Sequence, residues 1–119
     1  MTVKLSRAAY DLARNLVRQG HYVVDDRDEW SEHQPSAQAE NEYISEHGFG
    51  AYAKWHLGAD DEHPRDTKGH YKYPYGDFSA IHRCGVLAAE SRAAQRGHED
   101  IKDAAAHLHG MLDAVAPRR

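Results

Sequence analysis

The sequence predicts a small, mainly α-helical protein with one domain. Its 119 residues suffice for a single domain with a modest hydrophobic core. Apolar residues recur at helical spacing near both ends of the chain, and the segment between them carries the Gly, Pro and Asp residues that are typical of loops. We therefore expect one helical bundle over residues 1–119, with a C-terminal αα-hairpin, an extended tyrosine-rich loop and at most a minor β element.

The N-terminal segment, residues 6–19, has the pattern of an amphipathic helix. Ser6 is a candidate N-cap, and Gly20 stands where a left-handed C-terminal residue is common. One face of this helix is apolar and is made by Leu5, Ala9, Leu12 and Leu16. Residues 21–24, which are rich in β-branched and aromatic side chains, favour a short strand.

The central segment, residues 35–76, is predicted to contain two helices followed by a loop. Pro35 fits the first turn of a helix that ends near Gly48. A second helical piece begins at Phe49 and ends at Gly58. Residues 59–76 have the Gly, Pro and Asp content of a loop.

Alternating tyrosines mark the end of this loop. They lie on one side of an extended segment, and Pro74, which has no amide hydrogen, confines that segment to a sheet edge or to an unpaired arm. Exposed aromatic side chains commonly anchor protein interfaces. The sequence therefore predicts an interaction surface made by Tyr71, Lys72, Tyr73, Tyr75 and Arg92. The same tyrosines fit the core of the domain equally well, and both alternatives stay open.

Residues 77–115 have the pattern of an αα-hairpin. Asp77 is a candidate N-cap for a helix that ends at Gly97, and a final helix spans residues 99–115. Apolar residues of the final helix face small residues of the preceding one, which allows the two helices to approach closely. Cys84 falls seven residues inside the first helix, away from its N-terminal dipole, so we expect a buried and inert thiol.

Histidine is unusually frequent in the composition, with 10 copies. On a helix, residues two apart face different directions, so neither His82 with Cys84 nor His107 with His109 is expected to share a metal ion. Imidazoles and carboxylates in the central loop suit zinc or another divalent metal. The candidate ligands for such a site are His56, Asp60, Asp61, His63 and His70. In the alternative interpretation, most histidines are surface residues or lie at helix ends.

Other functional classes find little support in the sequence. It shows no catalytic constellation and no glycine-rich phosphate loop, so we identify no enzymatic activity or cofactor. The net charge of −4 and the dispersed arginines do not favour nucleic acid as a partner. A single cysteine and short apolar stretches predict a cytoplasmic protein without a disulfide or a membrane partner.

We therefore expect a small non-enzymatic module for interaction or assembly, whose partner is another protein or a second copy of the chain. Two alternatives remain. The first is a histidine-rich protein that binds a divalent metal and has a possible enzymatic role. The second is an accessory protein that binds nucleic acid.

Several motifs carry a resemblance to known sequences. The segments Trp30-Ser31-Glu32-His33 and Trp55-His56-Leu57-Gly58, with residues 67–78 and 82–92, resemble a family of small uncharacterised actinobacterial proteins. This similarity covers most of the chain and implies no activity. The second half also resembles a short domain of phage-associated and prophage-associated proteins, which implies an assembly-associated role. The residues that carry this second resemblance are Lys72, Tyr73, Pro74, Asp77, His82, Arg92 and Gln95.

Overall fold

The computed structural model describes residues 3–116, and the architecture is mainly helical, as predicted. The elements follow one another in the order β1 (Val3–Leu5), α1 (Arg7–Arg18), β2 (Tyr22–Val23), α2 (Trp30–His33), α3 (Ala37–Ala53), β3 (His56–Asp60), the 3-10 helix η1 (Lys68–His70), β4 (Tyr71–Pro74), β5 (Ile81–His82), α4 (Arg83–Arg96) and α5 (Glu99–Val115).

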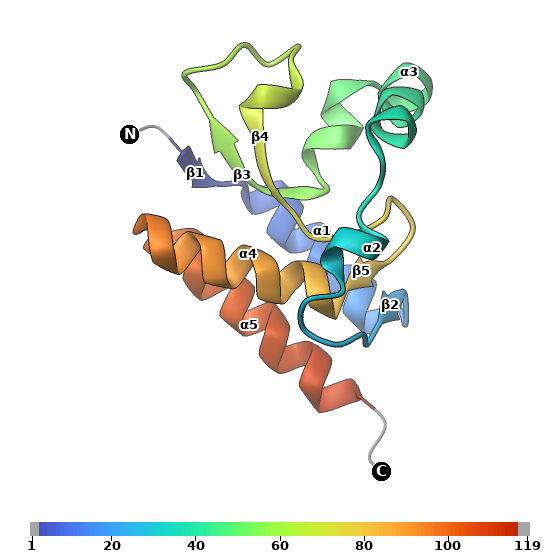
Figure 1. Ribbon diagram of the computed structural model, residues 1–119, viewed down its shortest axis with the longest axis vertical. Coiled ribbons are helices and arrows are strands. Elements are labelled where there is room, and N and C mark those ends of the chain that lie inside the picture. Colours follow the sequence, from blue (N-terminus) through green and yellow to red (C-terminus); the bar gives the residue numbers. More distant parts are fainter. Residues whose placement is uncertain (1–2, 117–119) are drawn as a thin grey trace.

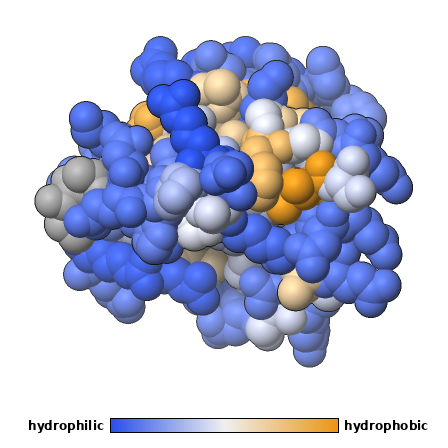
Figure 2. Space-filling model, turned by 90° about the horizontal axis from the view of Figure 1, so that it is seen from above, coloured by the Kyte–Doolittle hydropathy of each residue, from blue (hydrophilic) through white to orange (hydrophobic). Residues whose placement is uncertain are grey.

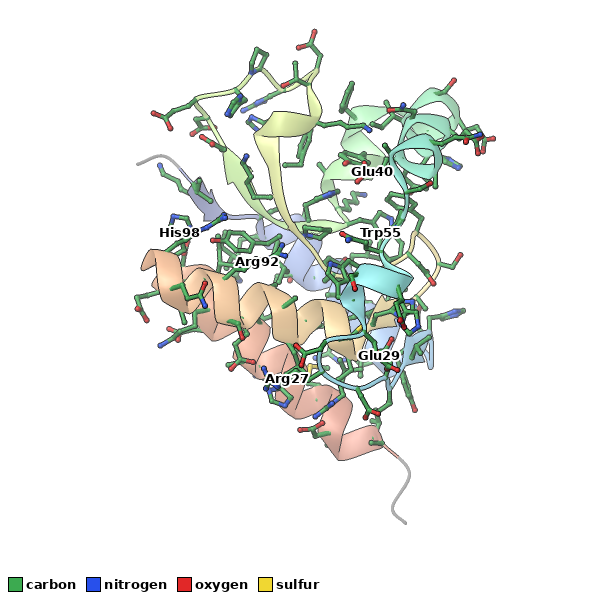
Figure 3. The ribbon with its side chains drawn as sticks, in the orientation of Figure 1. Arg27, Glu29, Glu40, Trp55, Arg92 and His98 are labelled. Carbon is green, nitrogen blue, oxygen red and sulfur yellow. The ribbon has the colours of Figure 1, made fainter. Side chains whose placement is uncertain are left out.

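The two C-terminal helices form the predicted αα-hairpin, which lies along one side of the molecule (Figure 1). Gly97 ends α4 in the left-handed conformation, with φ of 75°. The apolar stripe that the sequence predicts on α5 is fully buried at Ile101, Ala105, Leu108 and Leu112, whereas Val115 at its end is exposed. At this end of α4, Tyr73 Oη and His98 Nδ1 lie 2.6 Å apart, which ties the hairpin to β4. Figure 3 shows His98 at this end of α4 and Arg27 and Glu29 beside the opposite end.

The N-terminal helix is also confirmed. The Ser6 side chain accepts a hydrogen bond from the backbone N–H of Ala9, as expected of an N-cap. Ala9, Ala13 and Val17 are buried on the face that packs into the core. On the outer face, Arg14 pairs with Asp11. The amphipathic pattern therefore gave the bounds of α1 to within one residue, and of its predicted apolar face Ala9 and Leu16 are buried, whereas Leu5 and Leu12 are partly exposed.

The segment before α4 differs from the prediction. Asp77 Oδ1 accepts hydrogen bonds from the backbone N–H groups of Ser79 and Ala80 at 2.9 and 2.8 Å, which holds residues 77–80 in a turn. The chain then forms β5, and the helix begins at Arg83. Cys84 consequently lies in the first turn of α4 and not deep inside a helix.

The molecule contains more β-structure than the minor element that we predicted. β1, β3 and β4 form an antiparallel sheet with β3 in the centre, and β2 pairs with β5 in parallel. Gly58 does not end a helix. It lies in β3, where a Cβ would come within 2.9 Å of the Tyr73 ring. Close packing between strands explains this glycine, and Pro74 ends an edge strand, as its missing amide hydrogen requires.

The tyrosines complete the core, so the prediction of an exposed aromatic arm is wrong for two of the three. Tyr73 is 5% exposed and Tyr75 is 0% exposed. Tyr75 Oη donates a hydrogen bond to the carbonyl of Lys54 at 2.7 Å. Its ring stacks on Trp55 with the ring centroids 5.7 Å apart. Burial of these large side chains stabilises the sheet against the helices.

α3 lies beside the sheet, on the opposite side of the molecule from α5 (Figure 1). Gly48, with φ of 83°, interrupts its helical backbone at the point where we predicted a boundary between two helices. The face seen in Figure 2 is mostly hydrophilic, with a limited area of hydrophobic side chains. Within residues 3–116, no helix is both long and apolar enough to cross a bilayer.

The buried stripe of α5 predicts the effect of a core substitution. Leu108 is fully buried, so Leu108→Ala should lower the free energy of unfolding by about 2–5 kcal/mol because it removes apolar contacts and leaves a cavity. Val115→Ala is the matched control, since Val115 is 41% exposed, and its effect should stay within about 0.5 kcal/mol. Urea unfolding in the presence of a chelator measures both. Equal losses in the two variants would contradict the burial of Leu108 in the core.

Candidate metal centre

Two distant segments of the chain meet where β2 pairs with β5. The register places Val23 opposite His82. Asp25 follows β2 by two residues, and Cys84 follows β5 by two residues, so the strand pairing brings both side chains to the same end of the pair. The chain then continues through a short loop into α2, whose last residue is His33.

Asp25, His33, His82 and Cys84 form a cluster of candidate metal ligands. Each offers one ligand atom, and these four atoms all lie within 4.8 Å of one another. Asp25, His82 and Cys84 are buried, whereas His33 is partly exposed. Carboxylate, imidazole and thiolate are the side chains that bind zinc in proteins. This four-residue cluster is the one group with such geometry in the described part of the chain.

Asp25 is the centre of the cluster. Its Oδ2 accepts hydrogen bonds from His33 Nδ1 at 2.7 Å and from His82 Nδ1 at 2.8 Å. Its Oδ1 accepts a hydrogen bond from the backbone N–H of Cys84 at 2.7 Å. Burial raises the pKa of Asp25, but these hydrogen bonds outweigh it and lower the pKa to about 2. Asp25 is therefore ionised at neutral pH.

His82 has a carboxylate at each ring nitrogen. Its Nε2 donates a hydrogen bond to Asp77 Oδ2 at 2.8 Å, on the side away from Asp25. Burial lowers the pKa of His82, but the hydrogen bonds to Asp77 and Asp25 outweigh it, so the pKa is raised. A carboxylate that holds the outer nitrogen of an imidazole is the usual support for a metal-bound histidine. The ring is thus oriented with Nδ1 toward the cluster.

The thiol of Cys84 completes the cluster. Its Sγ lies 3.8 Å from His33 Nδ1. Burial and, after it, the neighbouring Asp25 raise the pKa of Cys84 to about 12. Cys84 lies in the first turn of α4, and the N-terminus of a helix commonly lowers the pKa of a thiol, but here this position does not outweigh the burial. The thiol is therefore protonated at neutral pH, and a metal ion would have to displace the proton.

These distances indicate what metal binding requires. In a tetrahedral zinc site, bond lengths of about 2.0–2.3 Å separate two N or O ligands by about 3.3 Å and an N from an S ligand by about 3.6 Å. The separation of 3.8 Å between His33 and Cys84 is close to this value. The separations of 2.7 and 2.8 Å between Asp25 and the imidazoles are hydrogen bonds. They must lengthen by about half an ångström to admit an ion.

Comparisons of this chain with protein families, with curated proteins and with solved structures found no match. The candidate site therefore rests on its own geometry and chemistry.

The ligands that we predicted from the sequence lie elsewhere and do not form such a group. His56, in β3, has its Nδ1 2.9 Å from the carbonyl of Tyr52. His70 Nδ1 lies 2.8 Å from the carbonyl of His63, whose own Nε2 is 3.8 Å from Asp60 Oδ2. These contacts link His70, His63 and Asp60 one after another and leave His56 apart, and they bring no metal-ligand group together within the described residues. Asp61 is exposed at the turn that follows β3.

Sequence reasoning missed Asp25 and His33 and set aside His82 with Cys84. The rule that residues two apart on a helix face different directions does not apply to the last pair, because the helix begins after His82. Asp25 stands in a run of charged residues, where the sequence gives no sign of burial.

Of the predicted interaction surface, Tyr71 and Lys72 are partly exposed and Arg92 is exposed on α4.

The buried imidazole of His56 predicts a pH dependence of stability. Burial lowers the pKa of His56 from 6.5 to about 4, although the Tyr52 carbonyl and the charge of Glu40 partly raise it. The unfolded chain therefore binds a proton more readily. The contribution of His56 is fully present above about pH 6.5 and is lost as the pH falls toward about 4, with a loss of about 2 kcal/mol by pH 5.

Urea unfolding of the wild type and of His56→Gln, at about pH 7.5 and about pH 5, measures this contribution. The variant has no imidazole at this position, so its stability should decline by about 2 kcal/mol less than that of the wild type. The same decline in both proteins would contradict the assignment.

Proposed function

We propose that this protein binds one divalent transition-metal ion, with zinc as the first candidate, through Asp25, His33, His82 and Cys84. The observation that supports the proposal is the convergence of these four side chains from two distant segments of the chain, residues 25–33 and 82–84. The Asp77 carboxylate behind His82 adds to this support, because it holds the imidazole as an outer-shell partner does in metal sites.

The choice of zinc follows from the donor set. Magnesium and calcium prefer oxygen ligands, and the cluster offers a thiol and two imidazoles beside a single carboxylate. Copper, nickel and cobalt accept the same donors, but a tetrahedral site with sulfur and nitrogen ligands is typical of zinc.

The proposed role of the ion is structural. Four protein ligands fill a tetrahedral shell, whereas catalytic zinc sites keep one position for water or substrate. The ion would link the loop after β2, the single turn of α2 and the start of α4. Helices as short as the four-residue α2 have little stability of their own, so a bond to His33 at its last position would hold it in place.

Such a role agrees with our expectation of a non-enzymatic module for interaction or assembly. A protein partner or a second copy of the chain, and a cytoplasmic location, stay predictions. The exposed tyrosine arm no longer supports them, because Tyr73 and Tyr75 are buried.

Titration of the metal-free protein with Zn²⁺ and Co²⁺ tests the metal site. We expect one ion per chain, and Co²⁺ should give the intense visible absorption of tetrahedral thiolate coordination. Cys84→Ser and His33→Ala should each weaken zinc binding by about a hundredfold or more, because even outer-shell partners contribute about 10–100-fold.

His63→Ala is the matched control, because His63 belongs to the loop set and lies outside the cluster. It should leave the affinity and the stoichiometry unchanged. The proposal fails if the wild type takes up no ion, or if His63→Ala reduces binding while Cys84→Ser does not.

The outer carboxylate gives a second, more selective prediction. Asp77→Asn keeps an oxygen for the backbone N–H groups of Ser79 and Ala80 but presents an amide to His82 Nε2. Zinc affinity should fall by about 10–100-fold, because the imidazole loses its negatively charged support. Isothermal titration calorimetry measures the affinity, and circular dichroism of the metal-free variant checks the fold. Unchanged affinity would show that Asp77 does not support the site.

A further inference from the structure

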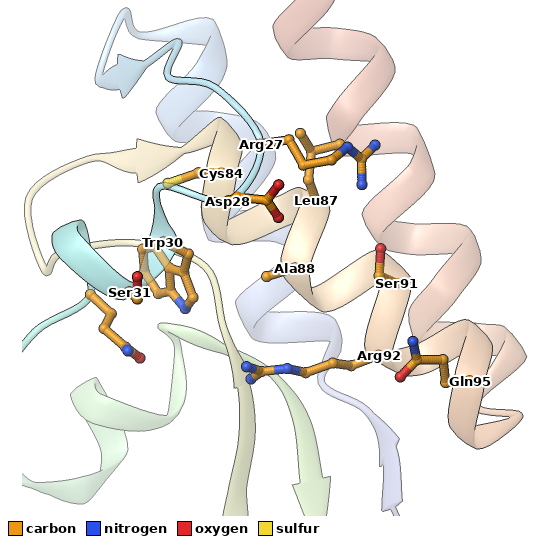
Figure 4. Close-up of a pocket in the computed structure, with 11 residues that line it drawn as sticks. Arg27, Asp28, Trp30, Ser31, Cys84, Leu87, Ala88, Ser91, Arg92 and Gln95 are labelled. Atoms are coloured by element: carbon orange, nitrogen blue, oxygen red, sulfur yellow. The ribbon is translucent and has the colours of Figure 1, made fainter.

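A pocket of about 350 Å³ lies beside the cluster, between α2 and α4 (Figure 4). Its volume falls at the lower end of the range for small-molecule sites. The side chain of Cys84 forms part of its wall, so the pocket and the cluster are neighbours. The lining residues that bear on its ligand are Arg27, Asp28, Trp30, Leu87, Ala88 and Arg92.

Trp30 is the most informative residue of the pocket. It is 5% exposed, and a Cβ at Gly85 would lie 3.0 Å from both Cε3 and Cζ3 of the indole, so this edge of the ring is closely packed. The indole N–H is on the opposite edge, and it has no hydrogen-bond acceptor within residues 3–116. The indole of Trp55, by contrast, donates to Tyr43 Oη at 3.2 Å. The indole nitrogen of Trp30 is not one of the enclosed, unpaired polar atoms of residues 3–116, so this N–H opens to the pocket that Trp30 lines and is free to donate to a ligand there.

The pocket also has an excess of unpaired positive charge. Arg27 and Arg92 both line it, and neither forms an ion pair or a hydrogen bond with any described residue. Arg83, on the same helix as Arg92, pairs with Asp113 at 2.8 Å. The single acid of the pocket, Asp28, leaves a net positive lining. In Figure 4 the guanidinium of Arg92 extends from α4 toward Trp30.

We propose that this pocket binds a small organic ligand through an oxyanion group, either a carboxylate or a phosphate. Arg92 and the indole N–H of Trp30 donate hydrogen bonds to the oxyanion, and Leu87 and Ala88 contact the apolar part of the ligand. A planar guanidinium suits both kinds of oxyanion because it donates two parallel hydrogen bonds. This site goes beyond the proposed metal role, and its donors are separate from the four metal ligands.

The two tryptophans of the chain provide the readout, because each gives one indole N–H signal in a nitrogen-15 NMR spectrum. The probes are phenyl phosphate and benzoate, with benzyl alcohol as the uncharged control. We expect a saturable shift of the Trp30 signal with a Kd below about 1 mM for at least one anion, and no shift of the Trp55 signal. Trp30→Phe assigns the signal. The anion that binds more tightly identifies the preferred oxyanion.

Substitutions then test the role of the guanidinium. Arg92→Gln should weaken binding by about tenfold or more, because a charge-assisted hydrogen bond is lost. Arg96→Gln is the matched control, since it removes the same charge from the same helix outside the pocket, and it should change the affinity less than about twofold.

Three results would overturn the proposal. The first is the absence of a saturable Trp30 shift with either anion. The second is an equal loss of affinity in Arg92→Gln and Arg96→Gln, which would show attraction by net charge alone. The third is binding that occurs only in the zinc-loaded protein and disappears in Cys84→Ser, since the anion would then bind the metal. The same shift in metal-free and zinc-loaded protein would support the pocket whatever the outcome for the metal site.

Discussion

The polar end of this molecule depends on the carboxylate of Asp25, which ties the loop after β2 to the start of α4. It accepts hydrogen bonds from the backbone N–H of Cys84 and from the imidazole of His82, which are 59 and 57 residues further along the chain. The parallel pairing of β2 with β5 is only two residues long and is too short to hold these segments by itself. The guanidinium of Arg83 donates a further hydrogen bond to the Asp25 carbonyl at 3.2 Å. One buried acid thus determines where the loop, α2 and the start of α4 meet.

Burial of so many polar groups is tolerated because they satisfy one another. Asp25 and Asp77 carry negative charge, and the raised pKa of His82 lets its ring carry the positive charge between them. A metal ion at the same place would take over that positive charge, while His82 became neutral and Cys84 lost its proton. The same side chains therefore suit a hydrogen-bonded network and a metal centre, and protons are exchanged for the ion.

The sequence predicted those parts of the fold that depend on local pattern. The apolar periodicity of α1 and α5 and the glycine that ends α4 are short-range signals, and the structure confirms them. The sequence did not predict β3. Gly58 stands where a glycine commonly ends a helix, and its place in a strand depends on the packing of Tyr73 against it. The candidate site was missed for the same reason. Asp25 and His33 are candidate ligands only together with His82 and Cys84, and the pairing of β2 with β5 brings these distant residues to them.

This long separation between partners also bears on the order in which the molecule assembles. The hairpin of α4 and α5 is made by contacts between neighbours in the sequence, so it has a small entropic cost of loop closure and is expected to form early. The contact between Asp25 and the start of α4 closes a much longer loop. It requires that the backbone N–H of Cys84 already points toward Asp25. The first turn of α4 meets this requirement, since its backbone amide is already directed by the helix. We expect the polar cluster to be a late event in folding, completed when the N-terminal part of the chain docks onto the finished hairpin.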